Sequence, residues 1–175
     1  AYWPLEADGR DLSPAGRDLD SNQLIFVPAG PGPALRVPRS QRNLAEHPDV
    51  HLAAGFQLGC DVWFDSLPAS SAVILQRGNE YLLRLDRAGD SAKLAWYLNF
   101  GGWEPRLTHS ANIVTGRWYR VAAGWDGRFS HLTVDARSER VRRSGVPTGH
   151  AAPLRLGSYS GLIANVWVTN PRRPV

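Results

Sequence analysis

Apolar and polar residues alternate along several short segments of the chain, most clearly in the segment WYRVAAGWDG at 118–127. A repeat of two residues places one set of side chains on one side of an extended strand. Asp126-Gly127 then supplies turn residues, and a second alternating run follows at 129–135. The pattern predicts an antiparallel hairpin, with these apolar residues of its first strand on one side: Tyr119, Val121, Ala123 and Trp125.

The same alternation continues through the chain, and the segment FQLGCDVWF at 56–64 is a clear example. We find no helical period, so we expect roughly ten to twelve strands in an all-β, antiparallel two-sheet β-sandwich of the jelly-roll type. A length of 175 residues fits a single domain, 1–175. The other predicted strands are a short N-terminal strand with Trp3 and Leu5, then 23–27, 34–37, 72–77, 81–86, 92–100, 138–143, 154–157 and 162–168.

Composition agrees with a globular β protein, because 43% of the residues are hydrophobic and 17 glycines and 13 prolines provide many turns. No apolar run approaches the roughly 20 residues of a membrane helix, so we expect no membrane span. The chain begins at Ala1, has no methionine and shows no signal peptide, which is typical of a processed protein or an excised domain. Cys60 is the single cysteine, and its apolar surroundings predict a buried thiol.

The formal net charge is +4, and arginine carries most of the positive charge. A solvated face is the interpretation we favour for the basic C-terminal third, over an anionic ligand and over nucleic acid, which we do not expect as a partner. The arginines of this region are Arg137, Arg140, Arg142, Arg143, Arg172 and Arg173.

The N-terminal loop is rich in aspartate, and Asp11 is the candidate ligand of a structural calcium ion. Calcium prefers several oxygen ligands on a loop of this kind. The spacing of Asp8, Asp11, Asp18 and Asp20 matches no calcium loop that we can derive, and aspartates also form turns. Both interpretations therefore remain open.

Two groups of residues are candidates for binding a sugar, since sugar sites pair a flat aromatic ring with polar side chains. The first is Trp103 in a glycine-rich loop, with Glu104, Arg106 and His109. The second would line the floor of a concave face if two predicted strands are neighbours: Asp61 and Trp63 on one, Tyr97 and Asn99 on the other. For the remaining tryptophans we expect packing in the core or between the sheets: Trp3, Trp96, Trp118, Trp125 and Trp167.

No motif predicts catalytic residues. Asp61 and Asp65 are the only carboxylates with the spacing of a glycosidase pair, and we assign them no catalytic role. A polysaccharide lyase would need residues such as Tyr97, His131 and Arg84 to meet, which the spacing does not indicate. No Ser-His-Asp arrangement and no phosphate-binding loop is present.

Five motifs, taken in order, resemble the laminin-G-like (LamG) jelly rolls of the concanavalin A-like lectin/glucanase superfamily. They are YWPLEADGRDLSPAG, LGCDVWF, WYRVAAGWDG, LTVD and LRLGSYSGLIANVWV. Members of that family commonly carry acidic residues before the final Val-x-Val, where this chain has Ala164 and Asn165. This departure weakens the expectation of calcium.

The resemblance implies a non-catalytic module that binds a polysaccharide or oligosaccharide, neutral or anionic, in a secreted, periplasmic or cell-surface protein. One alternative is a protein-interaction or structural domain without a sugar site, in which a protein would be the partner. A small glycoside hydrolase or polysaccharide lyase is a further alternative. A shared fold alone does not decide among these functions.

Overall fold

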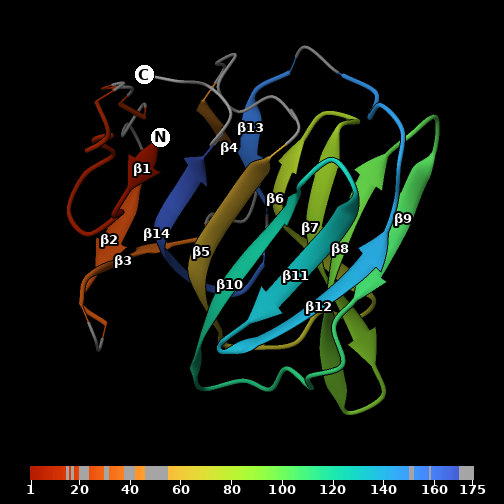
Figure 1. Ribbon diagram of the computed structural model, residues 1–175. Coiled ribbons are helices and arrows are strands. Elements are labelled where there is room, and N and C mark those ends of the chain that lie inside the picture. The colour runs from red at the N-terminus through yellow and green to blue at the C-terminus, as the bar shows by residue number, and fades with distance from the viewer. Residues whose placement is uncertain are drawn as a thin grey trace.

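Two antiparallel β-sheets lie face to face and enclose the core (Figure 1). The computed structural model describes residues 1–14, 16, 18–19, 24–29, 32–37, 42–45, 55–149, 152–157 and 159–169. These residues contain strands β1–β14 and no helix. The prediction of an all-β, antiparallel two-sheet sandwich is therefore confirmed, while Asp20, Arg172 and Arg173 lie outside the described residues.

The first sheet has eight strands in the order β12-β11-β10-β5-β14-β3-β2, with β1 paired to β14. Its longest strands, β5 and β14, lie side by side at its centre, and β12 forms one edge. The bounds are β1 Tyr2–Trp3, β2 Ile25–Val27, β3 Ala34–Arg36, β5 Phe56–Phe64, β10 Trp118–Trp125, β11 Phe129–Val134, β12 Arg137–Arg142 and β14 Gly161–Thr169.

The second sheet has six strands in the order β4-β13-β6-β7-β8-β9. Strands β6 to β9 follow one another in both sequence and space, so this half is a simple meander of adjacent hairpins. The bounds are β4 Arg42–Ala45, β6 Ser71–Arg77, β7 Tyr81–Ala88, β8 Ser91–Asn99, β9 Trp103–Thr108 and β13 Leu154–Leu156.

The predicted hairpin at 118–135 is confirmed as the antiparallel pair β10 and β11. Tyr119, Val121, Ala123 and Trp125 of β10 are buried in the core, as their alternation predicted. Strand β5 pairs with the other side of β10 over eight residues, from Trp118↔Trp63 to Trp125↔Phe56. The hairpin thus extends the central pair β5–β14 toward the β12 edge.

The core joins the inner faces of both sheets and contains a chain of aromatic contacts. The ring of Phe56 on β5 lies 4.9 Å from that of Tyr81 on β7, whose ring lies 5.5 Å from that of Trp96 on β8. Cys60 is buried as predicted, and this burial raises the pKa of its thiol far above the ordinary value. The thiol therefore stays protonated and contributes packing rather than reactivity.

A bulge in β14 changes which side chains of this strand face outward. The pairing with β5 shifts between Ala164 and Trp167, and Asn165 adopts a left-handed backbone conformation with φ of 51°. One extra residue in a strand moves the following side chains to the opposite face. Trp167 therefore lies on the outer face and packs directly over Gly59, so the expectation that it packs in the core or between the sheets is wrong.

One ion pair is enclosed entirely in the interior. Arg77 at the end of β6 pairs with Glu80 in the following turn, and both side chains are at most 2% exposed. Charges removed from water depend on their partners for compensation, and loss of one partner leaves the other uncompensated.

We expect Glu80→Gln to lower the free energy of unfolding by about 3–5 kcal/mol, because Arg77 would keep a buried charge without its carboxylate. Urea unfolding measures this loss. Glu104→Gln is the matched control, since Glu104 is exposed and makes no ion pair among the described residues. Equal stability of the two variants would contradict the prediction.

Candidate functional site

A pocket of about 530 Å³ opens on the outer face of the eight-stranded sheet. Its floor is formed by the neighbouring strands β10, β5 and β14, which run side by side in Figure 1. Its walls come from the loop after β1, the loop before β3 and the turn between β11 and β12. The lining residues are Glu6, Gly32, Pro33, Asp61, Trp118, Tyr119, Arg120, Asp135, Ala136, Ala164 and Asn165.

A chain of hydrogen bonds fixes the carboxylate of Asp61 in the pocket floor. Arg120 Nε donates to Asp61 Oδ1 at 3.2 Å, and Asn165 Nδ2 donates to Asp61 Oδ2 at 2.8 Å. The hydroxyl of Tyr2 donates to Asn165 Oδ1 at 2.9 Å. The bulge in β14 makes this arrangement, because it brings the Asn165 amide to the carboxylate on β5.

Trp118 supplies the aromatic surface of the pocket. Its indole is half-buried, and its centroid lies 6.1 Å from that of Trp63, the residue opposite it on β5. Trp63 Nε1 donates to Asp65 Oδ1 at 3.1 Å, which holds the second ring in place. The expectation that Trp118 packs in the core or between the sheets is wrong, because position 118 lies on the outer side of β10.

The β11–β12 turn provides the rim next to Arg120. Asp135 accepts a hydrogen bond from the Arg120 backbone N–H at 3.0 Å and forms an ion pair with Arg117. Glu6 reaches the opposite wall and makes no hydrogen bond or ion pair with a described residue. The pocket therefore combines an aromatic ring with fixed donors and acceptors, and carboxylates outnumber guanidinium groups among its lining residues.

Asp61 and Trp63 come together in this region, but Tyr97 and Asn99 do not join them. Strand β5 belongs to the eight-stranded sheet and β8 to the six-stranded sheet, so the expectation that they are neighbours is wrong. Asn99 Oδ1 accepts a hydrogen bond from the Gly101 N–H at 2.9 Å, which organises the turn after β8.

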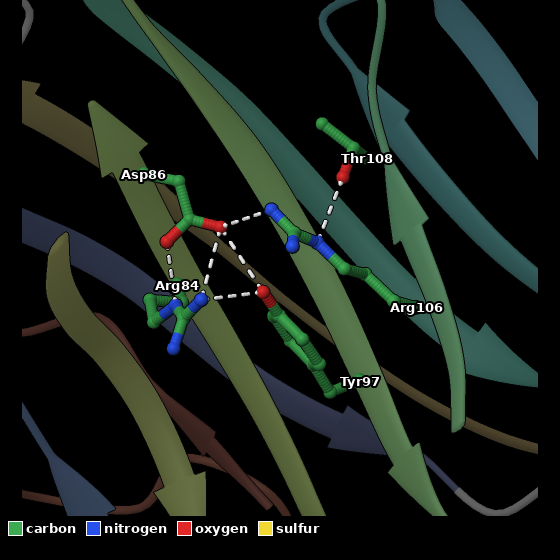
Figure 2. A network of polar contacts seen from close by, with 5 residues as sticks. All are labelled: Arg84, Asp86, Tyr97, Arg106 and Thr108. Carbon is green, nitrogen blue, oxygen red and sulfur yellow. Dashed lines mark hydrogen bonds and ion pairs between the residues drawn. The ribbon is translucent and has the colours of Figure 1, made fainter. Parts of the chain in front are cut away.

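Tyr97 belongs instead to a polar network on the outer face of the six-stranded sheet (Figure 2). Its hydroxyl accepts a hydrogen bond from Arg84 Nη2 at 2.5 Å and donates to Asp86 Oδ2 at 3.0 Å. Arg106 Nη2 donates to the same Asp86 oxygen at 3.0 Å, and Arg106 Nε donates to Thr108 Oγ1 at 3.2 Å. Two guanidinium groups also lie over the Tyr97 ring, at 4.7 and 5.5 Å from its centroid.

This network pairs its charged groups with one another and joins three adjacent strands, β7, β8 and β9. Burial, followed by the negative charge of Asp86, raises the pKa of Tyr97 above its ordinary value. A tyrosine that holds its proton this firmly is poorly suited to act as a base. His131 lies on β11 in the other sheet, so the three residues considered for a lyase do not meet.

We expect Asp86→Asn to lower the free energy of unfolding by about 1–3 kcal/mol, because two arginines and the Tyr97 hydroxyl lose the carboxylate that they share. Thermal or urea unfolding measures the change. The exposed Asp90→Asn in the β7–β8 turn is the control for loss of one negative charge. A stability loss no larger than that of the control would show that the network does not support the sheet.

His131 is half-buried on the outer side of β11, where its ring packs near Gly124. Burial lowers the pKa of His131 below its ordinary value of 6.5, and the nearby carboxylate of Asp126 offsets only part of this effect. The unfolded chain therefore binds a proton at His131 more tightly than the folded protein does.

The stability from neutral His131 is complete above the unfolded pKa of about 6.5 and is lost as the pH falls through the lower folded pKa. We expect His131→Gln to flatten the decline of unfolding free energy between roughly pH 7 and pH 5. Urea unfolding at a series of pH values measures the slope. An unchanged slope in the variant would disprove the contribution of His131.

Trp103 and its sequence neighbours do not form one cluster. Trp103 is the first residue of β9 rather than part of a loop, and its side chain is exposed. Arg106 belongs to the network with Asp86, while Glu104 is exposed. His109 is buried, with Nε2 3.0 Å from the Arg137 carbonyl oxygen and Nδ1 accepting from the Ala111 N–H. Its imidazole presents no exposed surface.

Asp11 is buried and organises the N-terminal turn. Its Oδ1 accepts hydrogen bonds from the backbone N–H groups of Tyr2 at 2.8 Å and Ser13 at 2.9 Å, and Asp18 accepts one from the Asp11 N–H. Across the described part of the chain, no three His, Cys, Asp or Glu side chains gather closely enough to hold a metal ion. The described contacts of Asp11 thus belong to the turn, and a calcium ion at this loop stays a prediction.

Sequence reasoning missed most of the pocket. Arg120 was available as the polar residue beside Tyr119 on the outer side of a predicted strand, and Trp118 occupied the same side two residues earlier. The family resemblance singled out Asn165 only as a lost acidic position, and its place in the pocket depends on the bulge in β14. Glu6 and Asp135 lie in turns whose approach to the pocket depends on the strand order.

The architecture and this outer-face pocket define a two-sheet jelly roll of the lectin-like class. A family model described as the concanavalin A-like lectin/glucanases superfamily, of the laminin G type, matches residues 43–170. The chain therefore belongs to this superfamily, and the predicted LamG resemblance is confirmed. A search of curated protein sequences finds no match.

Solved structures with the same fold include domain 4 of AbnA, a GH43 extracellular arabinanase from Geobacillus stearothermophilus, in complex with arabinotriose. It has a TM-score of 0.69 and 15% identity, and the alignment covers 96% of this chain and 90% of that domain. Domains LG4-5 of the mouse laminin α1 chain have a TM-score of 0.57 and 18% identity, and the alignment covers 77% of this chain and 40% of that chain. A heptameric SAP-like pentraxin from Limulus polyphemus has a TM-score of 0.57 and 13% identity, and the alignment covers 83% of this chain and 74% of that chain.

The described residues include no helix long and apolar enough to cross a membrane.

Proposed function

We propose that this chain is a non-catalytic carbohydrate-binding domain that holds a neutral oligosaccharide in the pocket over β10, β5 and β14. The observation that carries this proposal is the half-buried indole of Trp118 beside the fixed carboxylate of Asp61. A sugar ring offers an apolar C–H face to the indole and hydroxyl groups to the polar side chains. The volume of about 530 Å³ falls within the range of roughly 300–1,000 Å³ typical of ligand pockets.

The polar groups of the pocket suit hydroxyl groups because they include both acceptors and donors in fixed positions. Asp61 is held from two sides by Arg120 and Asn165, so little ordering is required when a ligand binds. Asp61, Asp135 and Glu6 give the pocket more negative than positive charge. An acidic sugar would be repelled there, so this pocket favours neutral sugars over anionic ones.

A binding role also fits the wider context of the fold. The similar domain from the Geobacillus arabinanase was solved with arabinotriose, and it is one part of an extracellular enzyme. By analogy with that domain, this chain would be a single module, 1–175, in a secreted, periplasmic or cell-surface protein that acts on glycans. Asp61 would orient the ligand, and no step of bond cleavage is assigned to it.

We expect Trp118→Ala to weaken binding of a neutral oligosaccharide at least tenfold, because the apolar face of the sugar loses its stacking surface. Affinity gels with neutral polysaccharides would identify a ligand, starting with arabinan, and calorimetry with arabinotriose or the matching oligosaccharide would measure Kd. Trp118→Phe, which keeps a ring, should retain most of the affinity. Asp61→Asn should weaken binding by a similar factor while preserving the shape of the pocket floor.

Trp103→Ala is the matched control, since it removes an exposed indole from the other sheet. Affinity that depends on Trp103 and not on Trp118 would move the site to β9 and refute the pocket. Retention of no neutral glycan at all would refute sugar binding there. Release of reducing sugar from a bound oligosaccharide, abolished in Asp61→Asn, would overturn the non-catalytic role.

A further inference from the structure

A basic surface covers the outer side of the β11–β12 hairpin, at the edge of the eight-stranded sheet. We call it the arginine strip, and it consists of Arg128, Phe129, Arg140 and Arg142. Register places Phe129 directly opposite Arg142, and His131 opposite Arg140. Alternation along β12 then points Arg140 and Arg142 to the same side, with about 6.6–7 Å between their backbone positions.

The guanidinium groups of the arginine strip have no carboxylate partner among the described residues. Arg128, Arg140 and Arg142 are all exposed, and none of them forms an ion pair there. Other arginines of this sheet behave differently: Arg117 pairs with Asp135, and Arg120 pairs with Asp61. The positive charge of the strip is therefore left for an external anion.

The carboxylates near the strip are engaged elsewhere. Glu139 alternates to the other side of β12, accepts a hydrogen bond from the Ser110 N–H at 3.0 Å and lies near Arg137 and His109. Asp126 accepts hydrogen bonds from the backbone N–H groups of Arg128 and Phe129, both at 2.7 Å. These contacts stabilise the turn. The guanidinium groups of Arg128 and Arg140 instead contact the Phe129 ring.

The Phe129 ring positions two of these guanidinium groups, and it is not free to stack on a ligand. The guanidinium carbon of Arg140 lies 4.7 Å from the ring centroid, and that of Arg128 lies 5.2 Å from it. Such contacts stabilise a cation at an aromatic face through the negative potential of the ring. The ring is thus occupied by cations, which disfavours stacking by a nucleic-acid base.

We propose that the arginine strip is a second binding site, which takes a linear polysaccharide carrying carboxylate or sulfate groups. Guanidinium groups bind both anions through paired N–H donors. A row of cations along one strand matches a chain with repeated anions, and the strip has no uncovered apolar anchor of the kind that dominates protein interfaces. Through His131, Arg140 is level with Gly124 on β10, four residues or about 14 Å along the strand from Arg120, so the strip is separate from the sugar pocket.

The test measures binding of the whole chain to dextran sulfate and to polygalacturonate, with uncharged dextran as the reference, by affinity electrophoresis and calorimetry at several salt concentrations. We expect Arg140→Gln/Arg142→Gln to weaken binding of at least one polyanion about tenfold and to reduce the dependence of affinity on salt. Comparison of the two polymers identifies sulfate or carboxylate as the preferred anion.

Arg87→Gln/Arg155→Gln is the matched control, because it removes the same charge from exposed arginines of the six-stranded sheet. This control should lose less than twofold, and both double variants should unfold at the same temperature as the unchanged protein. Equal losses in the two variants, or no polyanion binding, would overturn the proposal. Tighter binding of oligo(dT) than of either polysaccharide, lost in Phe129→Ala, would assign the strip to nucleic acid instead.

The sugar pocket and the arginine strip can be tested independently of each other. Trp118→Ala should leave polyanion binding unchanged, and Arg140→Gln/Arg142→Gln should leave binding of neutral oligosaccharides unchanged. Loss of both activities in either variant would contradict the separation of the two sites.

Discussion

Burial of every second side chain between the two sheets is the constraint on which the rest of this structure depends. The aromatic contacts from Phe56 through Tyr81 to Trp96 cross the interior and hold the sheets face to face. Because each strand commits one set of side chains to this core, the other set must face outward. Apart from a few buried groups such as the Arg77–Glu80 ion pair, polar side chains therefore lie on two outer faces that are separated by the core.

The two outer faces use their polar residues differently. On the six-stranded sheet, hydrogen bonds and ion pairs connect Arg84, Asp86, Tyr97 and Arg106 to one another and join adjacent strands (Figure 2). On the eight-stranded sheet, Asp61 lines an open pocket, and the guanidinium groups of the arginine strip form no ion pair with a described residue. Polar side chains that bind one another favour a structural role for their face of the sheet. Polar side chains that are fixed in position but accessible to solvent favour the binding of a ligand.

A pocket with excess carboxylate and a strip with excess guanidinium lie on the same sheet, at different ends of β10 and β11. Such an arrangement would allow a domain to hold a neutral chain at one end and an acidic chain at the other. Attachment of both to one rigid sheet would raise the effective concentration of one glycan near the second. The bulge in β14 is central to this division, because it aims Asn165 at Asp61 and gives the pocket its fixed floor.

The sequence alone determined the class of fold, the β10–β11 hairpin and the burial of Cys60, because alternation and turn residues are local signals. It also marked Asp61 and Trp63 as outward-facing. Tertiary structure decided the rest. Strand pairing is non-local, so only the fold could separate Tyr97 from Asp61, place Trp118 over the pocket and bury His109. The extra residue at Asn165 broke the local period and moved Trp167 outward, which no pattern of alternation predicts.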